Sequence, residues 1–257
     1  MELIVLMKQT FDTEEKIVVR DGAVQDDGAK LIINPYDEYA VEEAIRLRDL
    51  HGGQVTVVTV GTDRSAEALR TALAMGADEA VLIEEPAGGT DEAGVAKLLA
   101  AYARSRPFDA VLGGHFSVDR GSGQVALRVA QLLGIPHAGA VTKLDADPAA
   151  GRAVATRDAE GDDETVELPL PALFTAQQGL NEPRYPTLPG IMKAKKKPFA
   201  RLTADDLGLS GEETAPLTSA VELFPPPARQ AGVRLAGDAA DQARELVRTL
   251  REDAKAL

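Results

Sequence analysis

The sequence predicts an α/β fold: a largely parallel, Rossmann-like sheet with a small antiparallel hairpin region and a C-terminal arm. Over the first two-thirds of the chain, short apolar runs alternate with segments of helical periodicity, which is typical of a parallel sheet with crossover helices. Two strand-like stretches then flank a polar turn. Beyond Pro198 the periodicity fades, and Pro, Gly and acidic residues dominate. We therefore expect an α/β domain over residues 1–199 and an arm over residues 200–257 that ends in a helix.

Four apolar runs have the composition of strands that helices cover on both faces. They span residues 3–7, 55–60, 80–83 and 109–112. The first intervening helix should begin at Asn34-Pro35-Tyr36-Asp37, with Asn34 as the N-cap, Pro35 at the first helical position and Asp37 as a first-turn carboxylate. Thr90 should cap a later helix. Glycines mark the expected helix ends: Gly52, Gly76 and Gly134.

The last hundred or so residues change character. Residues 152–157 and 164–168 flank the polar stretch 158–163, which predicts an antiparallel hairpin. A final amphipathic helix is also predicted. Its apolar stripe comprises Ala243, Leu246, Val247, Leu250 and Leu257. Because long irregular segments are uncommon inside a compact domain, we expect this helix to pack on another protein, with folding back onto the core as the alternative.

Composition excludes several classes of protein. The formal net charge of −13 opposes general binding to nucleic acid or to an anionic membrane. The absence of cysteine excludes disulfides, thiolate metal sites and cysteine nucleophiles, and 3 histidines leave little material for a metal site or a triad. No apolar run has the roughly 18 residues of a transmembrane helix, and the N-terminal apolar stretch is too short for a signal peptide. We expect a cytoplasmic protein with no metal, no catalytic residue and no direct membrane insertion.

Three loops follow the carboxyl ends of predicted strands, where ligands bind in open α/β sheets. They lie after Met7, at residues 60–62 and at residues 113–124. In the third loop, glycines let backbone amides approach an anion, and Gly121-Ser122-Gly123 stands at the start of the next helix, whose positive end suits a phosphate. Asp119 could hold this loop or bond a ribose. Glycines that serve only tight turns are the alternative.

The segment 177–197, QQGLNEPRYPTLPGIMKAKKK, combines prolines, apolar side chains and lysines. Its prolines, Pro183, Pro186 and Pro189, predict a loop without a helix. Its apolar side chains, which are unfavourable to expose without a partner, are Leu180, Tyr185, Leu188, Ile191 and Met192. Lysines follow at positions 193, 195, 196 and 197. The combination favours docking onto an acidic protein surface, although the loop could instead pack over its own core.

These stretches carry a resemblance to a known family. LNEPRYPTLPGIMKAKKKP (180–198) resembles the signature of the electron-transfer flavoprotein β-subunit family. INPYDEYAVEEAIRLRD (33–49) and LRTALAMGADEAVLI (69–83) are similar to the same family. Together with GGHFSVDRGSGQV (113–125), the resemblance covers residues 1–198 nearly continuously, and the tail is similar to that of longer members.

The resemblance implies an electron carrier that forms a heterodimer with an α subunit. In this family the redox FAD lies chiefly on the α subunit, and the β subunit shields one side of its ring system. The expected sheet is then adenine nucleotide α-hydrolase-like, with a buried adenine nucleotide at the three loops. Carried over residue by residue, the nucleotide site comprises Leu6, Asn34, Pro35, Tyr36, Asp37, Val60, Gly61, Asp119, Arg120, Gly121, Ser122, Gly123, Gln124 and Val125.

The resemblance also implies electron transfer from acyl-CoA dehydrogenases of fatty acid β-oxidation to a membrane quinone oxidoreductase. Leu180 would be the leucine anchor that enters a pocket of the dehydrogenase. The implied partner-binding residues are Leu180, Asn181, Glu182, Pro183, Arg184, Tyr185, Ile191, Met192 and Lys193. The tail beyond Pro198 would wrap the α subunit.

The identity of the nucleotide stays open at this point. Typical members hold AMP, whereas electron-bifurcating members hold a second FAD. The sequence runs from Asp119 directly through RGSGQV, a short form that resembles the FAD-binding type, but Ala126-Leu127 stands where that type often has Gly-Pro. The intact dehydrogenase-type loop favours AMP. Thr13 stands where some relatives place an aromatic residue near the flavin, so flavin shielding would rely more on Tyr36.

Two other classes of protein compete with this interpretation. A nucleotide-dependent adenylating enzyme would need catalytic groups around residues 113–124, where only His115 and Asp119 present themselves. A nucleotide-sensing stress-type module would explain the loops but not residues 180–197.

Overall fold

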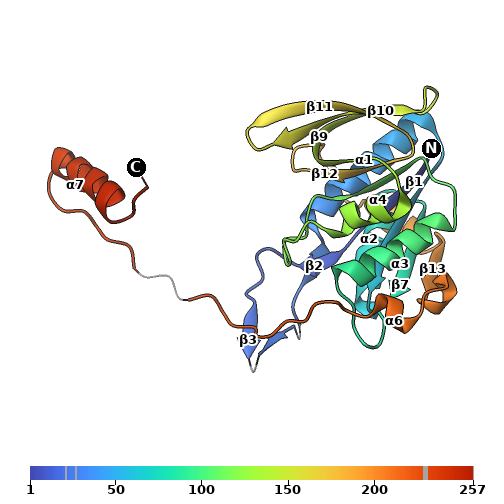
Figure 1. The fold of residues 1–257 in the computed structure, drawn as a ribbon, viewed down its shortest axis with the longest axis horizontal. Helices are drawn as coiled ribbons and strands as arrows, with labels where there is room; N and C mark the ends of the chain where they lie inside the picture. The colour runs from blue at the N-terminus through green and yellow to red at the C-terminus, as the bar shows by residue number, and fades with distance from the viewer. Residues whose placement is uncertain (21, 27, 228–230, 257) are drawn as a thin grey trace. The chain divides into compact units, whose positions relative to one another are not determined.

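Apolar runs without alternating polar residues become the inner strands of a nine-stranded sheet. The computed structural model describes residues 1–20, 22–26, 28–227 and 231–256, and the four predicted runs form strands in it. They are β1 (Glu2–Leu6), β6 (Gln54–Gly61), β7 (Glu79–Glu84) and β8 (Ala110–Gly114). Central residues such as Val5, Val57 and Val111 are buried because helices cover both faces of the sheet (Figure 1).

The order of the strands creates a point where the chain reverses direction across the sheet. The remaining strands are β9 (His137–Asp147), β10 (Arg152–Ala159), β11 (Asp162–Pro169), β12 (Ala172–Ala176) and β13 (Phe199–Leu202). The order is β11-β10-β9-β12-β8-β1-β6-β7-β13, parallel from β9 across to β13 and antiparallel at β10 and β11. The chain runs from β1 out to β6 and β7 and then returns to β8 on the other side of β1. The crevice between β1 and β8 is therefore the topological switch point.

Helices pack on both faces because successive side chains of each strand point to opposite sides. The helices are α1 (Pro35–His51), α2 (Ala66–Met75), α3 (Glu92–Arg104) and α4 (Val125–Leu133). The core cluster that contains Leu3 and Val5 draws on α1 and α2, whereas the cluster that contains Ile4 and Leu6 draws on α3 and α4. The predicted C-caps are confirmed at Gly52, Gly76 and Gly134.

The helix starts confirm one predicted cap position and correct another. Asn34 is at the N-cap position of α1 with Pro35 next to it, as predicted, but the Asn34 side chain makes no capping hydrogen bond. Thr90 is not the cap of α3. Asp91 takes that position, and its carboxylate accepts hydrogen bonds from the amides of Ala93 and Gly94. A carboxylate at a helix N-terminus also complements the helix dipole, which a threonine hydroxyl does not.

The predicted antiparallel hairpin is confirmed, with a tighter turn than expected. β10 and β11 pair continuously from Arg152 with Pro169 to Ala159 with Asp162. The turn is therefore Glu160-Gly161, and both residues have positive φ, 56° and 108°. Such two-residue turns match the twist of the flanking strands. Asp158, Asp162 and Asp163, which were predicted to lie in the turn, therefore belong to the strands.

Residues 188–194 form a helix, α5 (Leu188–Ala194), where the prolines predicted none. The prediction was wrong because Pro189 lies in the first turn, where its missing N–H would have had no helical partner. The Thr187 side chain caps the helix by accepting from the amide of Gly190. A Cβ on Gly190 would overlap the carbonyl oxygen of Ala74, so glycine is required for the close approach of α5 to α2.

The compact unit that holds the sheet continues beyond residue 199. β13 pairs in parallel with β7, and the short helix α6 (Gly211–Thr214) contacts α3. Thr214 is fully buried, and its carbonyl oxygen accepts a hydrogen bond from the Thr90 hydroxyl. This unit comprises residues 1–17 and 25–221. It also contains β2 (Gln9–Phe11), β5 (Leu31–Ile33) and two short 3-10 turns, η1 (Asp63–Ser65) and η2 (Asp205–Leu207).

A second unit comprises residues 18–24 and 222–257. It contains β3 (Val18–Arg20), most of β4 (Ala23–Gln25) and α7 (Ala239–Glu252), which Asp238 caps. The predicted apolar stripe lies on α7 except for Leu257, which is outside the described residues, and Leu246 and Val247 are exposed. Within the part of the chain that the structure describes, no helix has the length and apolar character needed to cross a membrane.

Candidate functional site

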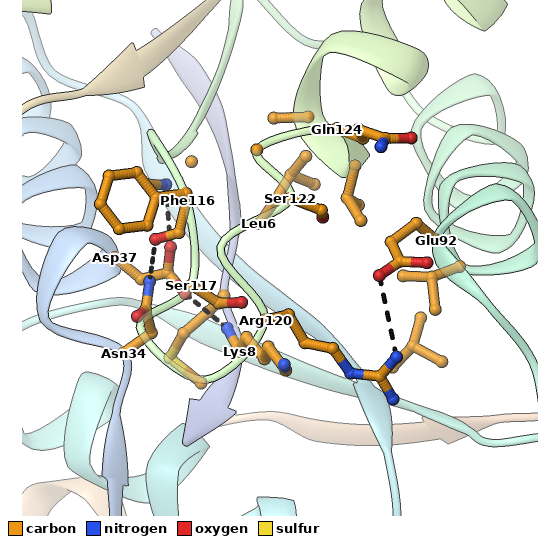
Figure 2. Close-up of a pocket in the computed structure, with 18 of the residues that line it drawn as sticks. Leu6, Lys8, Asn34, Asp37, Glu92, Phe116, Ser117, Arg120, Ser122 and Gln124 are labelled. Carbon is orange, nitrogen blue, oxygen red and sulfur yellow. Dashed lines mark hydrogen bonds and ion pairs between the residues drawn. The ribbon is translucent and has the colours of Figure 1, made fainter. Parts of the chain in front are cut away.

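A pocket of about 340 Å³ opens at the carboxyl ends of β1, β6 and β8, beside the switch point (Figure 2). Most of the residues predicted for the nucleotide site line it: Leu6, Asn34, Asp37, Val60, Asp119, Arg120, Ser122, Gly123, Gln124 and Val125. The others, Pro35, Tyr36, Gly61 and Gly121, adjoin these positions in the chain without being part of the wall. The volume lies in the range of small-molecule sites. The pocket thus lies at the loops that follow the predicted strands, while its role as a nucleotide site stays a prediction.

Two glycines that line the pocket are tightly packed against neighbouring residues. A Cβ on Gly114 would overlap the Asp37 carboxylate and lie 2.8 Å from the carbonyl carbon of Tyr36. Gly123 has a φ of +60°, and a Cβ there would lie 3.3 Å from the carbonyl oxygen of His115. Glycine at both places therefore lets the loop 113–124 pack closely, against the start of α1 at Gly114 and against His115 at Gly123.

The N-terminus of α1 holds the loops together through two buried side chains. Asp37 accepts hydrogen bonds from the amides of Lys8 (2.7 Å) and Gly114 (2.8 Å), at the ends of β1 and β8. The Asn34 side chain donates to the carbonyl of Phe116 (2.9 Å) and accepts from the amide of Val118 (3.1 Å). The Asn34 side chain thus binds the glycine-rich loop and caps no amide of α1 (Figure 2). The sequence identified both residues but not these partners.

Burial sets the electrostatics of Asp37. Loss of hydration raises the pKa of this carboxyl to about 7, while the hydrogen bonds from the Lys8 amide, Asn34 and the Gly114 amide oppose that rise. An acidic group that resists ionisation leaves less negative charge in the pocket, which favours an anionic ligand there.

Lys8 is a pocket residue that the sequence reasoning missed. Its ammonium group forms an ion pair with Asp119 at 2.6 Å, so the end of β1 is tied to the glycine-rich loop. Burial disfavours the Asp119 carboxylate, but the hydrogen bond and charge of Lys8 more than compensate and hold the pKa of Asp119 below its ordinary value. Across the pocket, Arg120 lies 3.8 Å from Glu92, as Figure 2 shows. Both cations lie where they could exchange a carboxylate for a phosphate.

The N-terminal residues of three helices meet in the wall of the pocket. Asn34 and Asp37 belong to α1, Asp91 and Glu92 to α3, and Gln124 with Val125 to α4. Aligned peptide dipoles make such helix ends positive, which favours an anion nearby. At α3, however, the amides of Ala93 and Gly94 are already bound to the Asp91 carboxylate. The α3 contribution was missed because residues 90–92, at the start of that helix, contain no glycine.

Phe116 of the glycine-rich loop forms an aromatic pair with Tyr36 of α1. The rings of Tyr36 and Phe116 stack at 4.3 Å between centroids, and His115 lies edge-on to Phe116 at 5.5 Å. Burial lowers the pKa of His115, so the neutral ring is favoured. Apolar side chains opposite the glycine-rich loop, including Leu6, Val60 and Leu99, complete the wall. The pocket therefore offers an apolar surface for a base and donors for phosphate.

A second surface comprises the loop 177–187 with α5, here called the docking segment. Among its leucines, Leu180 is partly buried against the main core, whereas Leu188 is 75% exposed. Tyr185 is 90% exposed, and Ile191 and Met192 are also exposed. The remaining predicted residues, Asn181, Glu182, Pro183, Arg184 and Lys193, lie on the same segment. The structure thus leaves the second half of the segment, and not its first leucine, open to a partner.

The lysine cluster divides into two kinds of residue. Lys193, Lys195 and Lys196 are exposed. Lys197 instead donates hydrogen bonds to the carbonyl oxygens of Leu73 (3.0 Å) and Ala77 (2.6 Å) at the end of α2. Burial lowers the pKa of Lys197. A cation that occupies this position at the last carbonyls of a helix stabilises the fold. Lys197 therefore differs from the three exposed lysines, which are free to face a partner.

Fold and pocket together define an α/β protein with a ligand-sized pocket at the switch point of its sheet. Comparison with known proteins identifies its family. Residues 21–207 match the family model described as electron transfer flavoprotein domain. The chain is 54% identical over 259 residues to the electron transfer flavoprotein subunit beta of Bacillus subtilis, with all of both chains covered. It is 42% identical to the subunit beta of Syntrophomonas wolfei, over 91% of this chain and 90% of that one. The subunit beta of Sus scrofa is 38% identical over 98% of this chain and 97% of its own.

The chain belongs to the electron transfer flavoprotein family, among its β subunits. Membership implies an electron carrier that involves a flavin, and not an enzyme that makes or breaks bonds with its own side chains. The resemblance found in the sequence is thereby confirmed, as is the predicted α/β fold.

Proposed function

We propose that this chain is the β subunit of a heterodimer that takes electrons from acyl-CoA dehydrogenases and passes them to a quinone oxidoreductase of the membrane. The redox-active FAD would be held chiefly by the α subunit, whose existence the β-subunit names of the relatives imply. The observation that carries the proposal is the switch-point pocket, where three helix N-termini and a glycine loop surround a space suited to an adenine nucleotide.

In this proposal the residues of the pocket bind and orient a nucleotide and perform no chemistry. The amides around Gly123 and Gln124, at the start of α4, would hold the phosphate, assisted by Lys8 or Arg120. Apolar walls at Leu6 and Val60 would contact the base or ribose. The flavin supplies the redox chemistry, and this chain supplies shielding, position and a docking surface.

We propose AMP as the nucleotide, because the docking segment is of the kind that simple electron transfer requires. A second FAD is the alternative, since the loop from Asp119 to Gln124 is short. The test is to denature the purified αβ complex and to measure the mass and amount of each nucleotide released. One AMP and one FAD per heterodimer are expected. Two FAD and no AMP would contradict simple electron transfer and favour electron bifurcation.

We propose that the docking segment contacts the dehydrogenase through an exposed leucine. The sequence favours Leu180, which stays a prediction. The exposed area favours Leu188, which lies at the start of α5 beside Ile191 and Met192. Stopped-flow reduction of the flavin by an acyl-CoA dehydrogenase tests the function directly. Reduction that saturates with dehydrogenase concentration is expected, and a complex that no acyl-CoA dehydrogenase reduces would refute the proposed donor.

The second unit would be the arm that packs on the α subunit. Its helix α7 presents an apolar stripe that includes Leu246 and Val247. The cytoplasmic location expected from the sequence is part of the same proposal.

A further inference from the structure

The docking segment is attached to α1 by two buried carboxylates. Glu42 and Glu43 lie in the middle of α1, and they are only 5% and 3% exposed. Burying an ionised carboxylate is unfavourable unless hydrogen bonds or opposite charges compensate. Both side chains find that compensation in residues 181–184 of the docking segment.

Glu42 and Arg184 form a bidentate ion pair. Arg184 Nε donates to Glu42 Oε2 at 2.8 Å, Nη2 donates to Oε1 at 3.0 Å, and the amide of Arg184 donates to Oε2 at 3.2 Å. The carboxylate therefore fixes both the side chain and the backbone of Arg184. A two-point contact of this kind defines an orientation, which a lysine in place of arginine could not reproduce.

Glu43 adds a second attachment three residues earlier in the segment. Asn181 Nδ2 donates to Glu43 Oε2 at 2.9 Å and to the carbonyl oxygen of Tyr39 at 3.0 Å. Arg46 donates to the same Glu43 oxygen at 3.2 Å. Burial raises the pKa of Glu43, and the hydrogen bond from Asn181 and the charge of Arg46 oppose that rise.

The other end of the docking segment is attached to α2. Gly190 approaches the carbonyl of Ala74 closely, and Lys197 donates to the carbonyls of Leu73 and Ala77. The exposed residues from Tyr185 to Met192 therefore lie between two attachments. A loop held in this way loses less conformational entropy when it binds a partner.

We propose that Glu42 and Glu43 are positioning residues for docking: from inside α1 they hold residues 181–184 so that the exposed apolar side chains after them are presented in a fixed place. The inference rests on the proposed function, because it deepens the role of the docking segment. The two carboxylates of α1 thus contribute to recognition of the electron donor through the segment that they hold, without contacting the donor.

The experiment uses the αβ complex with Glu42→Gln, with Arg184→Lys as a second variant from the other side of the contact. Two quantities are measured: amide hydrogen exchange of residues 178–187, and flavin reduction as a function of dehydrogenase concentration. Glu167→Gln is the matched control, because Glu167 pairs with Arg152 at 2.9 Å on the exposed β10–β11 hairpin. Each change is also made in a Leu188→Ala background.

Glu42→Gln should accelerate exchange in residues 178–187 and raise the half-saturating dehydrogenase concentration about tenfold, the scale of one lost charge-assisted hydrogen bond, with the limiting rate and flavin content unchanged. In the Leu188→Ala background most of that effect on half-saturation should disappear. The leucine anchor is already absent there, so displacing the loop has little further effect on binding. Glu167→Gln should change neither quantity.

Unchanged exchange and unchanged half-saturation in both variants would overturn the inference. Full additivity with Leu188→Ala would do the same, because it would indicate a general loss of stability. A wild-type complex that no dehydrogenase reduces would refute the proposed function instead, and the exchange measurement would still decide whether the carboxylates hold the segment.

Discussion

The switch-point pocket and the docking segment differ in what determines their shape. The pocket is concave and assembled from the ends of strands and helices, so its geometry follows from the topology of the sheet. The docking segment is mostly irregular, and single contacts hold it in place: Glu43 and Glu42 of α1 bind Asn181 and Arg184, and Lys197 donates to a backbone carbonyl of α2. Backbone therefore shapes the site that would bind a nucleotide, whereas side-chain contacts shape the surface that would bind a protein. Changes to backbone space should harm the first, and changes to single polar contacts should harm the second.

The largest effect is expected at the floor of the pocket. Gly114→Ala places a Cβ against the Asp37 carboxylate and the Tyr36 backbone, which costs about 3 kcal/mol of stability or prevents folding. Gly113→Ala is the matched control, because a Cβ there meets Leu6 Cβ at an ordinary 3.5 Å. Thermal melts and nucleotide content of the αβ complex compare the two. Equal melting temperatures would mean that the pocket tolerates side chains on its floor.

The two leucines of the docking segment should separate recognition from stability. Leu188→Ala removes an exposed side chain and should weaken dehydrogenase binding about a hundredfold, the loss expected for a leucine that fills a pocket, with normal melting. Leu180→Ala removes a side chain that packs on the core and should lower the melting temperature. Stopped-flow flavin reduction and thermal melts measure both. The reverse pattern would return the anchor to Leu180.

Two carboxyl groups of the pocket should respond to pH in opposite directions. The pKa of Asp37 is raised from 3.8 to about 7, so the folded chain retains a proton that the unfolded chain has lost, and stability falls as pH rises through this window. The pKa of Asp119 is lowered, so its contribution is present above 3.8 and is lost as pH falls through the lower folded value. Urea unfolding of the wild type, Asp37→Asn and Asp119→Asn between pH 3 and 8 provides the measurement. Parallel pH profiles for the two variants would contradict these assignments.

The smallest effect concerns the lysines. Lys197→Met should lower stability by about 1 kcal/mol through lost hydrogen bonds to α2, with little effect on the rate of association with the dehydrogenase. Lys195→Met should leave stability unchanged and slow association chiefly at low ionic strength. Association rates at two salt concentrations, together with thermal melts, distinguish the two lysines. A salt-dependent rate defect in Lys197→Met would show that this lysine also faces the partner.

The place of the pocket could be predicted from the sequence because it depends on local signals. The strands that end at the pocket, β1, β6 and β8, were visible as apolar runs, whereas β9, β12 and β13 were not predicted. Parallel strands bring their carboxyl ends to one edge of the sheet. Glycines at 114 and 123 allow close approach of neighbouring segments, and their local pattern also drew attention to the loop 113–124.

The partners of the pocket residues could not be predicted, since they are distant in the chain. Lys8 and Asp119 are 111 residues apart, and Glu42 and Arg184 are 142 apart. Charge at one position does not identify a partner until the fold is known. The helix α5 was missed for another reason: a rule about helix interiors was applied to Pro189, which lies in a first turn.

The outer strand β11 has a consequence for how the protein behaves at high concentration. An open edge of a long sheet is a template on which a second copy can add its own strand. β11 presents Asp162, Asp163, Glu164 and Glu167 along that edge, and only the last two pair with arginines of β10 among the ion pairs seen. Two such edges repel each other before their backbones can meet. Because salt screens that repulsion, edge-to-edge aggregation should set in first in concentrated salt.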